Sequence, residues 1–377
     1  MEQYVKVRKE SDRKSHVMGH AFASFCITPK QQEAVLTYFE TPEHAVTASE
    51  KEWTEFFCLA ESFGFSETVK NKIRQVQKND HEKVYDRLKE EGICFVTKED
   101  ETYPEKLRDV FSAPRFFYYK GVLPETIPCI AIVGARNCTG YGSGMAGKLA
   151  YELAEQGVGV ISGLAYGVDK AAHDGALRAG GSTFAVMGCG IDICYPHSHK
   201  MTYERILTEG GGIISEYPPG TKPLSWFFPQ RNRIIAGLSD GVLVTEARQK
   251  SGSLITVSFG LEYGKSIYAV PGRVDDVLSE GCNFLLKEGA KPVTCCADIL
   301  EELFPDTRQG SNEVRPVFSA EEKQVYEYLT YHTKHVEQIL SETKLSYGQL
   351  VKVLDGLTKR GYVKRQGQAY YGRTGES

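Results

Sequence analysis

Seven short, almost continuous apolar runs constrain the fold of this chain more than any other feature. They lie at residues 127–134, 158–163, 182–188, 211–217, 241–247, 265–272 and 292–296. Each run is followed by a glycine-rich turn and a stretch of helical character. Strands buried on both faces of a parallel sheet have this unbroken apolar pattern. The sequence therefore predicts an α/β fold with a doubly wound, mostly parallel, Rossmann-like sheet.

The chain has 377 residues, which is too long for one ordinary domain and predicts two or three. Residues 20–92 are helical in pattern, and residues 93–123 form a connector with a short strand or two. Residues 319–373 favour three helices and a hairpin, which describes a winged helix-turn-helix or a plain helical bundle. The predicted parts are an N-terminal helical domain with its lead-in at 1–98, a Rossmann-like domain at 99–305, a linker at 306–318 and a winged-helix domain at 319–377.

Bulk properties exclude several classes of protein. No apolar run reaches the length of a membrane span, and the polar N-terminus lacks the apolar centre of a signal peptide, so a cytoplasmic location is expected. The ten cysteines show no metal-site spacing, and we interpret them as reduced thiols with no metal bound. The formal net charge of -4 argues against a protein that coats duplex DNA, so a nucleic-acid site would have to be local.

In an open parallel sheet, ligands bind at the carboxyl ends of the strands. The first such loop, residues 133–142, carries Arg136 but lacks the GxGxxG pattern of dinucleotide enzymes, so no NAD or FAD cofactor is expected. The second loop offers the Ser162 hydroxyl and the Gly163 amide to a phosphate at a helix start. In the following helix, Asp169 suits a cap and His173 suits a packed side chain.

Later loops supply more candidate anion-binding groups. Lys200 begins a helix, a position where the positive charge of a lysine is unfavourable to the helix dipole. This placement is explained if Lys200 binds an external anion, and the alternative is a solvated surface lysine. Arg231 and Arg233 flank Asn232 and offer planar donors to phosphates, although one arginine could instead pair with an internal carboxylate, Glu216 or Glu246. A further cradle of hydroxyls and amides is predicted at Ser251, Gly252 and Ser253.

No catalytic motif accompanies these loops. The chain has no Walker A sequence, no HExxH, no GxSxG and no paired-carboxylate nuclease motif. The sequence therefore predicts a binding protein and not an enzyme.

The ordered set of loops resembles one family. VGARNCTGYG, SGLAYGVDKAAHDGAL, FAVMGCGIDICYP, FFPQRNRIIAGLSDGVLVTEA, SGSLITVSFGLEYG and AVPGR are similar to successive blocks of the DprA (Smf) family, over roughly residues 92–305. The resemblance implies an extended Rossmann-like domain, a small N-terminal helical (SAM-like) domain and a C-terminal winged helix. It also implies a homodimer that binds and protects single-stranded DNA and loads RecA recombinase onto it during natural transformation.

By the same resemblance, the DNA contacts fall on Arg136 and Lys200. A second set of residues is expected to line the same crevice. Its members are Arg231, Arg233, Asn232, Ser162, Gly163, Ser251, Gly252 and Ser253. The alternative function is a nucleotide-binding enzyme of the phosphoribohydrolase group, which carries a PGGxGTxxE loop where this chain has residues 246–256. A third interpretation is an adaptor that recruits recombinase, and the winged helix is left open between DNA and protein contact.

Overall fold

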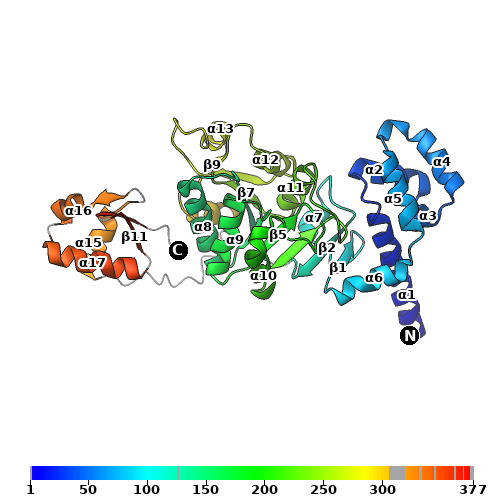
Figure 1. Cartoon of the computed structure of the whole chain (residues 1–377), viewed down its shortest axis with the longest axis horizontal. Coiled ribbons are helices and arrows are strands. Elements are labelled where there is room, and N and C mark those ends of the chain that lie inside the picture. The colour runs from blue at the N-terminus through cyan, green and yellow to red at the C-terminus, as the bar shows by residue number, and fades with distance from the viewer. Residues whose placement is uncertain are drawn as a thin grey trace.

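The computed structural model describes residues 2–124, 127–304, 319–330, 333–343, 345–360, 362–367 and 369–373. The predicted linker at 306–318 lies outside the described residues. The elements form a helical N-terminal part, a large central sheet with covering helices, and a small C-terminal part (Figure 1). Among the described helices, none has both the length and the apolar character needed to cross a membrane.

The predicted parallel sheet is confirmed. Its strands are β3 (Cys129–Val133), β4 (Gly159–Ser162), β5 (Thr183–Met187), β6 (Gly212–Ser215), β7 (Gly241–Val244), β8 (Ser266–Ala269) and β9 (Lys291–Pro292). The strands β3 to β7 are buried along their whole length, which explains their unbroken apolar sequence. The prediction for the last strand is wrong in extent, because only Lys291 and Pro292 pair with β8.

Two antiparallel strands from the connector extend this sheet. They are β1 (Cys94–Thr97) and β2 (Phe116–Gly121), and β2 pairs with β6. The strand order is β1-β2-β6-β5-β4-β3-β7-β8-β9. Because β3 lies between β4 and β7, the winding of the sheet reverses beside β3, as in a doubly wound fold. The sheet thus begins before the boundary predicted between residues 98 and 99.

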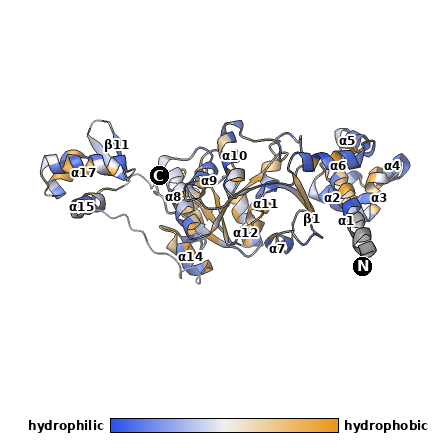
Figure 2. Ribbon diagram, turned by 90° about the horizontal axis from the view of Figure 1, so that it is seen from below, coloured by the Kyte–Doolittle hydropathy of each residue, from blue (hydrophilic) through white to orange (hydrophobic). Residues whose placement is uncertain are grey.

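Helices cover both faces of the sheet. One face carries α8 (Gly140–Glu155), α9 (Val168–Arg178), α10 (Lys200–Thr208) and α14 (Ala297–Leu303), and the other carries α7 (Glu105–Arg108), α11 (Phe227–Leu238), α12 (Ser253–Glu262) and α13 (Glu280–Lys287). Side chains of β3 alternate between the two cores, with Ile130 and Ile132 on the first face and Ala131 and Val133 on the second. Hydrophobic residues accordingly gather along the central sheet (Figure 2).

The N-terminal part is helical, as predicted. Its elements are α1 (Glu2–Ala23), α2 (Pro29–Phe39), α3 (Pro42–Thr47), α4 (Glu50–Leu59), η1 (Glu61–Phe63), α5 (Glu67–Gln77) and α6 (His81–Glu90). An aromatic core built around Phe22, Phe39 and Trp53 continues into Phe116 and Tyr118 of β2. The helical part therefore packs against the antiparallel edge of the sheet.

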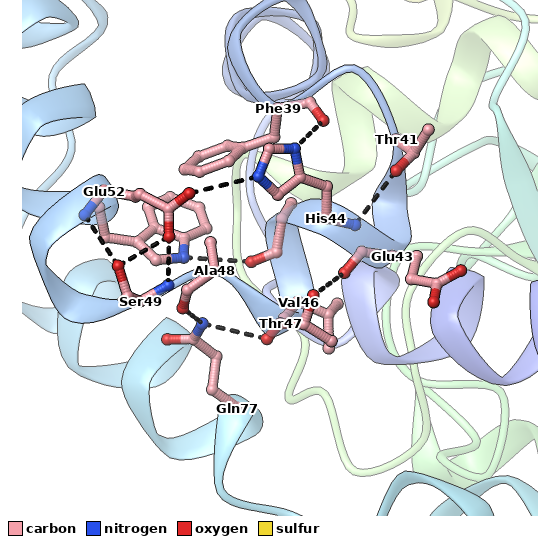
Figure 3. A network of polar contacts seen from close by, with 12 residues as sticks. Phe39, Thr41, Glu43, His44, Val46, Thr47, Ala48, Ser49, Glu52 and Gln77 are labelled. Carbon is pink, nitrogen blue, oxygen red and sulfur yellow. Dashed lines mark hydrogen bonds and ion pairs between the residues drawn. The ribbon is translucent and has the colours of Figure 1, made fainter.

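Polar contacts fix the turns between the short N-terminal helices (Figure 3). Ser49 caps α4 in a capping box with Glu52. His44 of α3 bonds to the Phe39 carbonyl at 2.9 Å and contacts the Glu52 carboxylate at 3.4 Å. Gln77 of α5 donates to two carbonyls at the end of α3, at 3.0 and 2.8 Å. The end of α3 is thus satisfied by its neighbours, as a buried helix terminus requires.

The C-terminal part has its own core. Its elements are α15 (Ala320–Tyr328), β10 (Lys334–His335), α16 (Val336–Thr343), α17 (Tyr347–Lys359), β11 (Val363–Gln366) and β12 (Tyr370–Arg373), with the strands in the order β10-β12-β11. The buried residues of this core all lie between Val325 and Val363. Three helices and a hairpin occur in the predicted order, and the assignment to the winged-helix class stays a prediction.

Candidate nucleic-acid interface

A cleft of about 740 Å³ opens at the carboxyl ends of β3, β4 and β7. This is the point where the winding of the sheet reverses, which is where open α/β sheets bind ligands. The lining comes from the loops after these strands, from the loops that follow β5, β6 and β8, and from α11 and the starts of neighbouring helices. Its polar and aromatic members are Arg136, Asn137, Asp169, Tyr195, Ser225, Phe228, Arg231, Asn232, Arg248, Lys250, Ser251, Ser253 and Thr256.

The cleft is locally basic although the chain is acidic overall. Its lining contains four cationic side chains, Arg136, Arg231, Arg248 and Lys250, against the single carboxylate of Asp169. The formal net charge of the whole chain is -4. A local excess of positive charge in a concave site attracts anions even on an acidic protein. The expectation of a confined site for an anionic ligand is consistent with this distribution.

The end of β7 holds the loop that presents Arg136. Thr139 caps α8, and its amide and hydroxyl donate to the buried Glu246 carboxylate at 2.7 and 2.6 Å. The Ala135 amide donates to the Glu246 carbonyl at 2.7 Å. A side chain at Gly142 would clash, because a Cβ there would lie 2.5 Å from the Glu246 carboxylate. Glu246 therefore belongs to the scaffold of this loop and pairs with neither arginine of α11 in the described contacts.

Arg136 is exposed and lies over an aromatic layer. Its guanidinium carbon is 5.4 Å from the centre of the Phe228 ring. On the Phe228 ring, in turn, lies Tyr195, with ring centres 5.6 Å apart and planes inclined by 33°. Tyr195 is 45% exposed, so its ring is available to a ligand. A cation and a pair of contacting aromatic rings in one place suit both the phosphate and the base of a nucleotide.

The structure corrects the role expected for Ser162 and Gly163. Ser162 is fully buried, and its hydroxyl donates to the Ile132 carbonyl at 2.6 Å. The Gly163 amide donates to the Asp169 carboxylate at 3.1 Å. Neither residue is part of the cleft lining. Both groups are engaged within the fold, so neither receives a phosphate in this arrangement.

Arg231 reaches the floor of the cleft but is almost completely buried. It is 4% exposed, and its guanidinium donates to the carbonyls of Gly163, at 2.9 Å, and Val186. Burial lowers the pKa of Arg231, and the nearby Asp169 carboxylate opposes this shift. The neighbouring Asn232 side chain lines the cleft and donates to the Gly252 carbonyl at 3.3 Å. Of this pair, Asn232 is the side chain with access to a ligand.

Arg233 does not lie in the cleft, so its predicted place was wrong. Its guanidinium pairs with the Glu216 carboxylate at 2.6 Å, and both side chains are less than a tenth exposed. One of the two internal carboxylates considered from the sequence therefore does take one arginine. The pair lines a different pocket, on the side of α2. Successive arginines of a helix separated by one residue point in different directions, which explains their different fates.

Lys200 lies at the start of α10 and outside the cleft lining. It is exposed, and its ammonium is 3.7 Å from the Glu204 carboxylate, one turn along the same helix. This is the geometry of a solvated surface lysine. It leaves the residue free to meet an anion that extends past the cleft, because exposed pairs of this kind contribute little energy.

The loop between β7 and α12 contributes more than predicted. Ser251, Gly252 and Ser253 line the cleft at the N-terminus of α12, and the two hydroxyls are 2.8 Å apart. Arg248 and Lys250 from the same loop are exposed and also line the cleft. The sequence interpretation missed these two cations. Their position between a buried strand and a predicted anion cradle was the available indication.

His173 is a packed side chain, and the cysteines are free thiols. His173 is fully buried, and burial lowers its pKa to about 3. Its Nδ1 donates to the Thr183 hydroxyl at 2.7 Å, because that hydroxyl itself donates to the Val160 carbonyl. All ten cysteines are free thiols, and burial raises the pKa of several of them. Within the described ranges, no cluster of three or more histidine, cysteine or acidic side chains is close enough to hold a metal ion.

Comparison with curated proteins shows relatives of one kind. The chain is 45% identical over 204 residues to the DNA processing protein DprA of Streptococcus pneumoniae, covering 54% of this chain and 72% of the relative. It is 37% identical over 235 residues to DprA of Bacillus subtilis, covering 60% and 79%. With the protein Smf of Escherichia coli it shares 39% identity over 231 residues, covering 59% and 62%.

Two solved structures share the fold. The X-ray structure of DprA from S. pneumoniae matches with a TM-score of 0.60 and 35% identity, over 75% of this chain and 96% of that one. A structure of DprA from Helicobacter pylori, described as giving insight into its single-stranded DNA binding mode, matches with a TM-score of 0.51 and 30% identity, over 57% and 96%. The family model described as DNA recombination-mediator protein A matches residues 94–304. Because that range is more than half of the chain, the protein belongs to the DNA recombination-mediator protein A family, which confirms the resemblance seen in its loops.

Proposed function

We propose that this protein binds single-stranded DNA in the cleft and acts there as a recombination mediator without catalysing a reaction. The observation that carries the proposal is the combination of exposed cations with two contacting aromatic rings at the switch point of the sheet. Arg136, Arg248 and Lys250 contact phosphates, because they are the exposed cations of the lining. The N-terminus of α12, with Ser251 and Ser253, supplies amides and hydroxyls to a further phosphate.

Base contact in this proposal is by stacking and carries little sequence information. Tyr195 and Phe228 form the platform, and an exposed base stacked on an aromatic ring contributes about 1–3 kcal/mol. Single strands offer such unpaired bases and a duplex does not, so the platform favours the single strand. Lys200 extends the track of cations beyond the cleft.

The relatives support the wider role. One is described as a single-stranded DNA binder and several as DNA processing proteins. We extend this to the present chain as a cytoplasmic homodimer that protects incoming single strands and loads RecA recombinase onto them during natural transformation. The alternative, a phosphoribohydrolase-like enzyme, is disfavoured by the sequence of the loop between β7 and α12. This loop carries Arg248, Lys250 and Ser251 where such enzymes have the PGGxGTxxE motif.

Fluorescence anisotropy with a labelled single-stranded oligonucleotide and its duplex, across a salt series, tests the proposal. We expect preference for the single strand and a steep salt dependence of binding. Arg136→Gln and Lys250→Gln each remove one phosphate contact, so each weakens binding and makes the slope of log K against log salt shallower by about 0.7.

Lys89→Gln on α6 is the matched control, because it removes one exposed charge away from the cleft. It should leave affinity and slope close to those of the wild type. An Arg136→Gln variant with wild-type affinity and slope would take Arg136 out of the site. Absence of binding by the wild type at low salt would overturn the direct DNA role.

A further inference from the structure

The loop between β4 and α9 adopts a conformation that needs support. Leu164 has a φ of 53°, a left-handed conformation that is uncommon for residues other than glycine, and its side chain is fully buried. Gly167, three residues on, has a φ of 75°. A backbone of this kind persists only where the surrounding contacts hold it in place.

Four hydrogen bonds from three side chains hold this loop. The Asp169 carboxylate accepts from the amides of Gly163 at 3.1 Å and Ala165 at 3.4 Å. The Arg231 guanidinium donates to the Gly163 carbonyl at 2.9 Å. His199 bonds to the Leu164 carbonyl at 3.0 Å. Asp169 and Arg231 thus hold the amide and the carbonyl of the same residue, Gly163, with opposite charges.

The loop in turn supports the backbone of Arg136. The Val168 amide donates to the Ala135 carbonyl at 3.2 Å. At Gly167, a Cβ would lie 2.3 Å from the Ala135 carbonyl oxygen and 2.5 Å from that of Arg136, so the two backbones are in direct contact. Any change in the shape of the loop therefore displaces the residue that carries the exposed guanidinium.

Asp169 and Arg231 are almost completely buried, and their described hydrogen bonds are all made within the fold. Asp169 is 7% exposed and Arg231 is 4% exposed. The Arg231 Nη1 atom donates to two carbonyls, and its Nε donates to Asn232 at 3.2 Å. Both residues line the cleft only at its floor, where they are almost completely buried.

We propose that Arg231 and Asp169 act as positioning residues, which lock the loop after β4 in the shape that supports Arg136 and do not themselves contact a phosphate. This inference rests on the proposed single-stranded DNA site and assigns a different role to one of its predicted contacts. A loss of affinity alone does not distinguish a residue that contacts a phosphate from one that positions such a residue. A contact residue changes the number of phosphates neutralised, whereas a positioning residue changes only how well the others are placed.

The test combines salt-dependent binding with amide hydrogen exchange on the full chain. We expect Arg231→Gln and Arg231→Lys each to weaken binding to a labelled oligonucleotide by about tenfold, the equivalent of one lost hydrogen bond to a charged group, with the salt slope of the wild type. Lysine does not rescue, because one ammonium cannot replace the planar guanidinium. Arg248→Gln serves as the contact reference, and its slope should be shallower by about 0.7.

Hydrogen exchange distinguishes local positioning from general destabilisation. In Arg231→Gln and Asp169→Asn, the amides of residues 163–167 should exchange faster while those of β3 and β5 keep their protection. General destabilisation would accelerate all of them. A shallower slope in Arg231→Gln, or wild-type affinity in Arg231→Lys, would overturn the inference.

Hydrogen exchange of the wild-type protein without DNA tests the positioning role even if the variants do not fold. Fast exchange at the Gly163 and Ala165 amides, at the rate of an exposed loop, would show that the lock does not exist. If the wild type fails to bind any single strand, the proposed function falls, and the exchange data still report on the lock by themselves.

Discussion

At the scale of single residues, burial separates side chains that the sequence presents as equals. Arg136, Arg231 and Arg233 all belong to loops or helix starts at the same edge of the sheet. Only Arg136 is exposed, while Arg231 serves the backbone beneath the cleft and Arg233 pairs with Glu216. The residue types indicated anion binding, but internal carbonyls and carboxylates compete for the same guanidinium donors.

The buried pair gives a prediction that contrasts with a role in DNA contact. Glu216→Gln leaves the Arg233 guanidinium buried without its counter-charge, and we expect the free energy of unfolding to fall by about 3–5 kcal/mol. Urea unfolding followed by circular dichroism measures this loss. Glu216→Leu combined with Arg233→Met should be less destabilised, because an apolar pair carries no unpaired charge. A small effect of Glu216→Gln, below about 1 kcal/mol, would contradict this account.

At the scale of elements, the helices were more predictable than the way they dock. The periodic pattern of residues 20–92 indicated helices, and five α-helices, α2 to α6, lie there together with the end of α1. The contact between α1 and β2, in contrast, joins His20 and Tyr118, which are 98 residues apart in the sequence. No local pattern reports a contact at that distance, because periodicity shows which face is apolar and not what covers it.

This docking contact predicts a pH dependence. Burial lowers the pKa of His20 to about 4 from a usual value of 6.5, with a smaller effect of His81. Between these values the unfolded chain binds a proton that the folded chain does not, so stability falls as the pH decreases from 6.5 towards 4, by about 3 kcal/mol in all. His173 acts in the same direction, with a pKa of about 3.

His20→Gln removes one of these two contributions and keeps a group that can bond to the Tyr118 hydroxyl. Between about pH 7.5 and pH 5, the variant should lose about 2 kcal/mol less unfolding free energy than the wild type. Urea titrations at the two pH values measure the difference. Equal losses in both proteins would mean that His20 protonates freely in the folded state.

At the scale of the whole molecule, the sequence predicted the sheet and the edge where the cleft lies, but not which side chains reach the cleft. The parallel strands were recognisable because both of their faces are buried, as the full burial of β3 shows. The position of the cleft agrees with the rule that open parallel sheets bind ligands at the carboxyl ends of their strands. Arg248 and Lys250 were missed because only the folded loop shows that they face the cleft, and Ser162 was misplaced because its hydroxyl bonds to the neighbouring strand.

The separation of the cores leads to the last prediction. The buried cluster of the C-terminal part contains no residue of the sheet or of the N-terminal helices, whereas those two share one cluster through Phe116 and Tyr118. A chain truncated after residue 316 should therefore fold and keep the single-strand affinity and salt slope of the full chain, since every residue of the cleft lies before that point. Anisotropy with single-stranded and duplex oligonucleotides, together with a RecA pulldown, measures what the truncation removes.

Loss of duplex binding alone would assign the C-terminal part to DNA, and loss of RecA capture alone would assign it to protein contact. A weaker single-strand affinity with a shallower slope would show that cations of the C-terminal part belong to the same DNA track, and would contradict a site confined to the cleft.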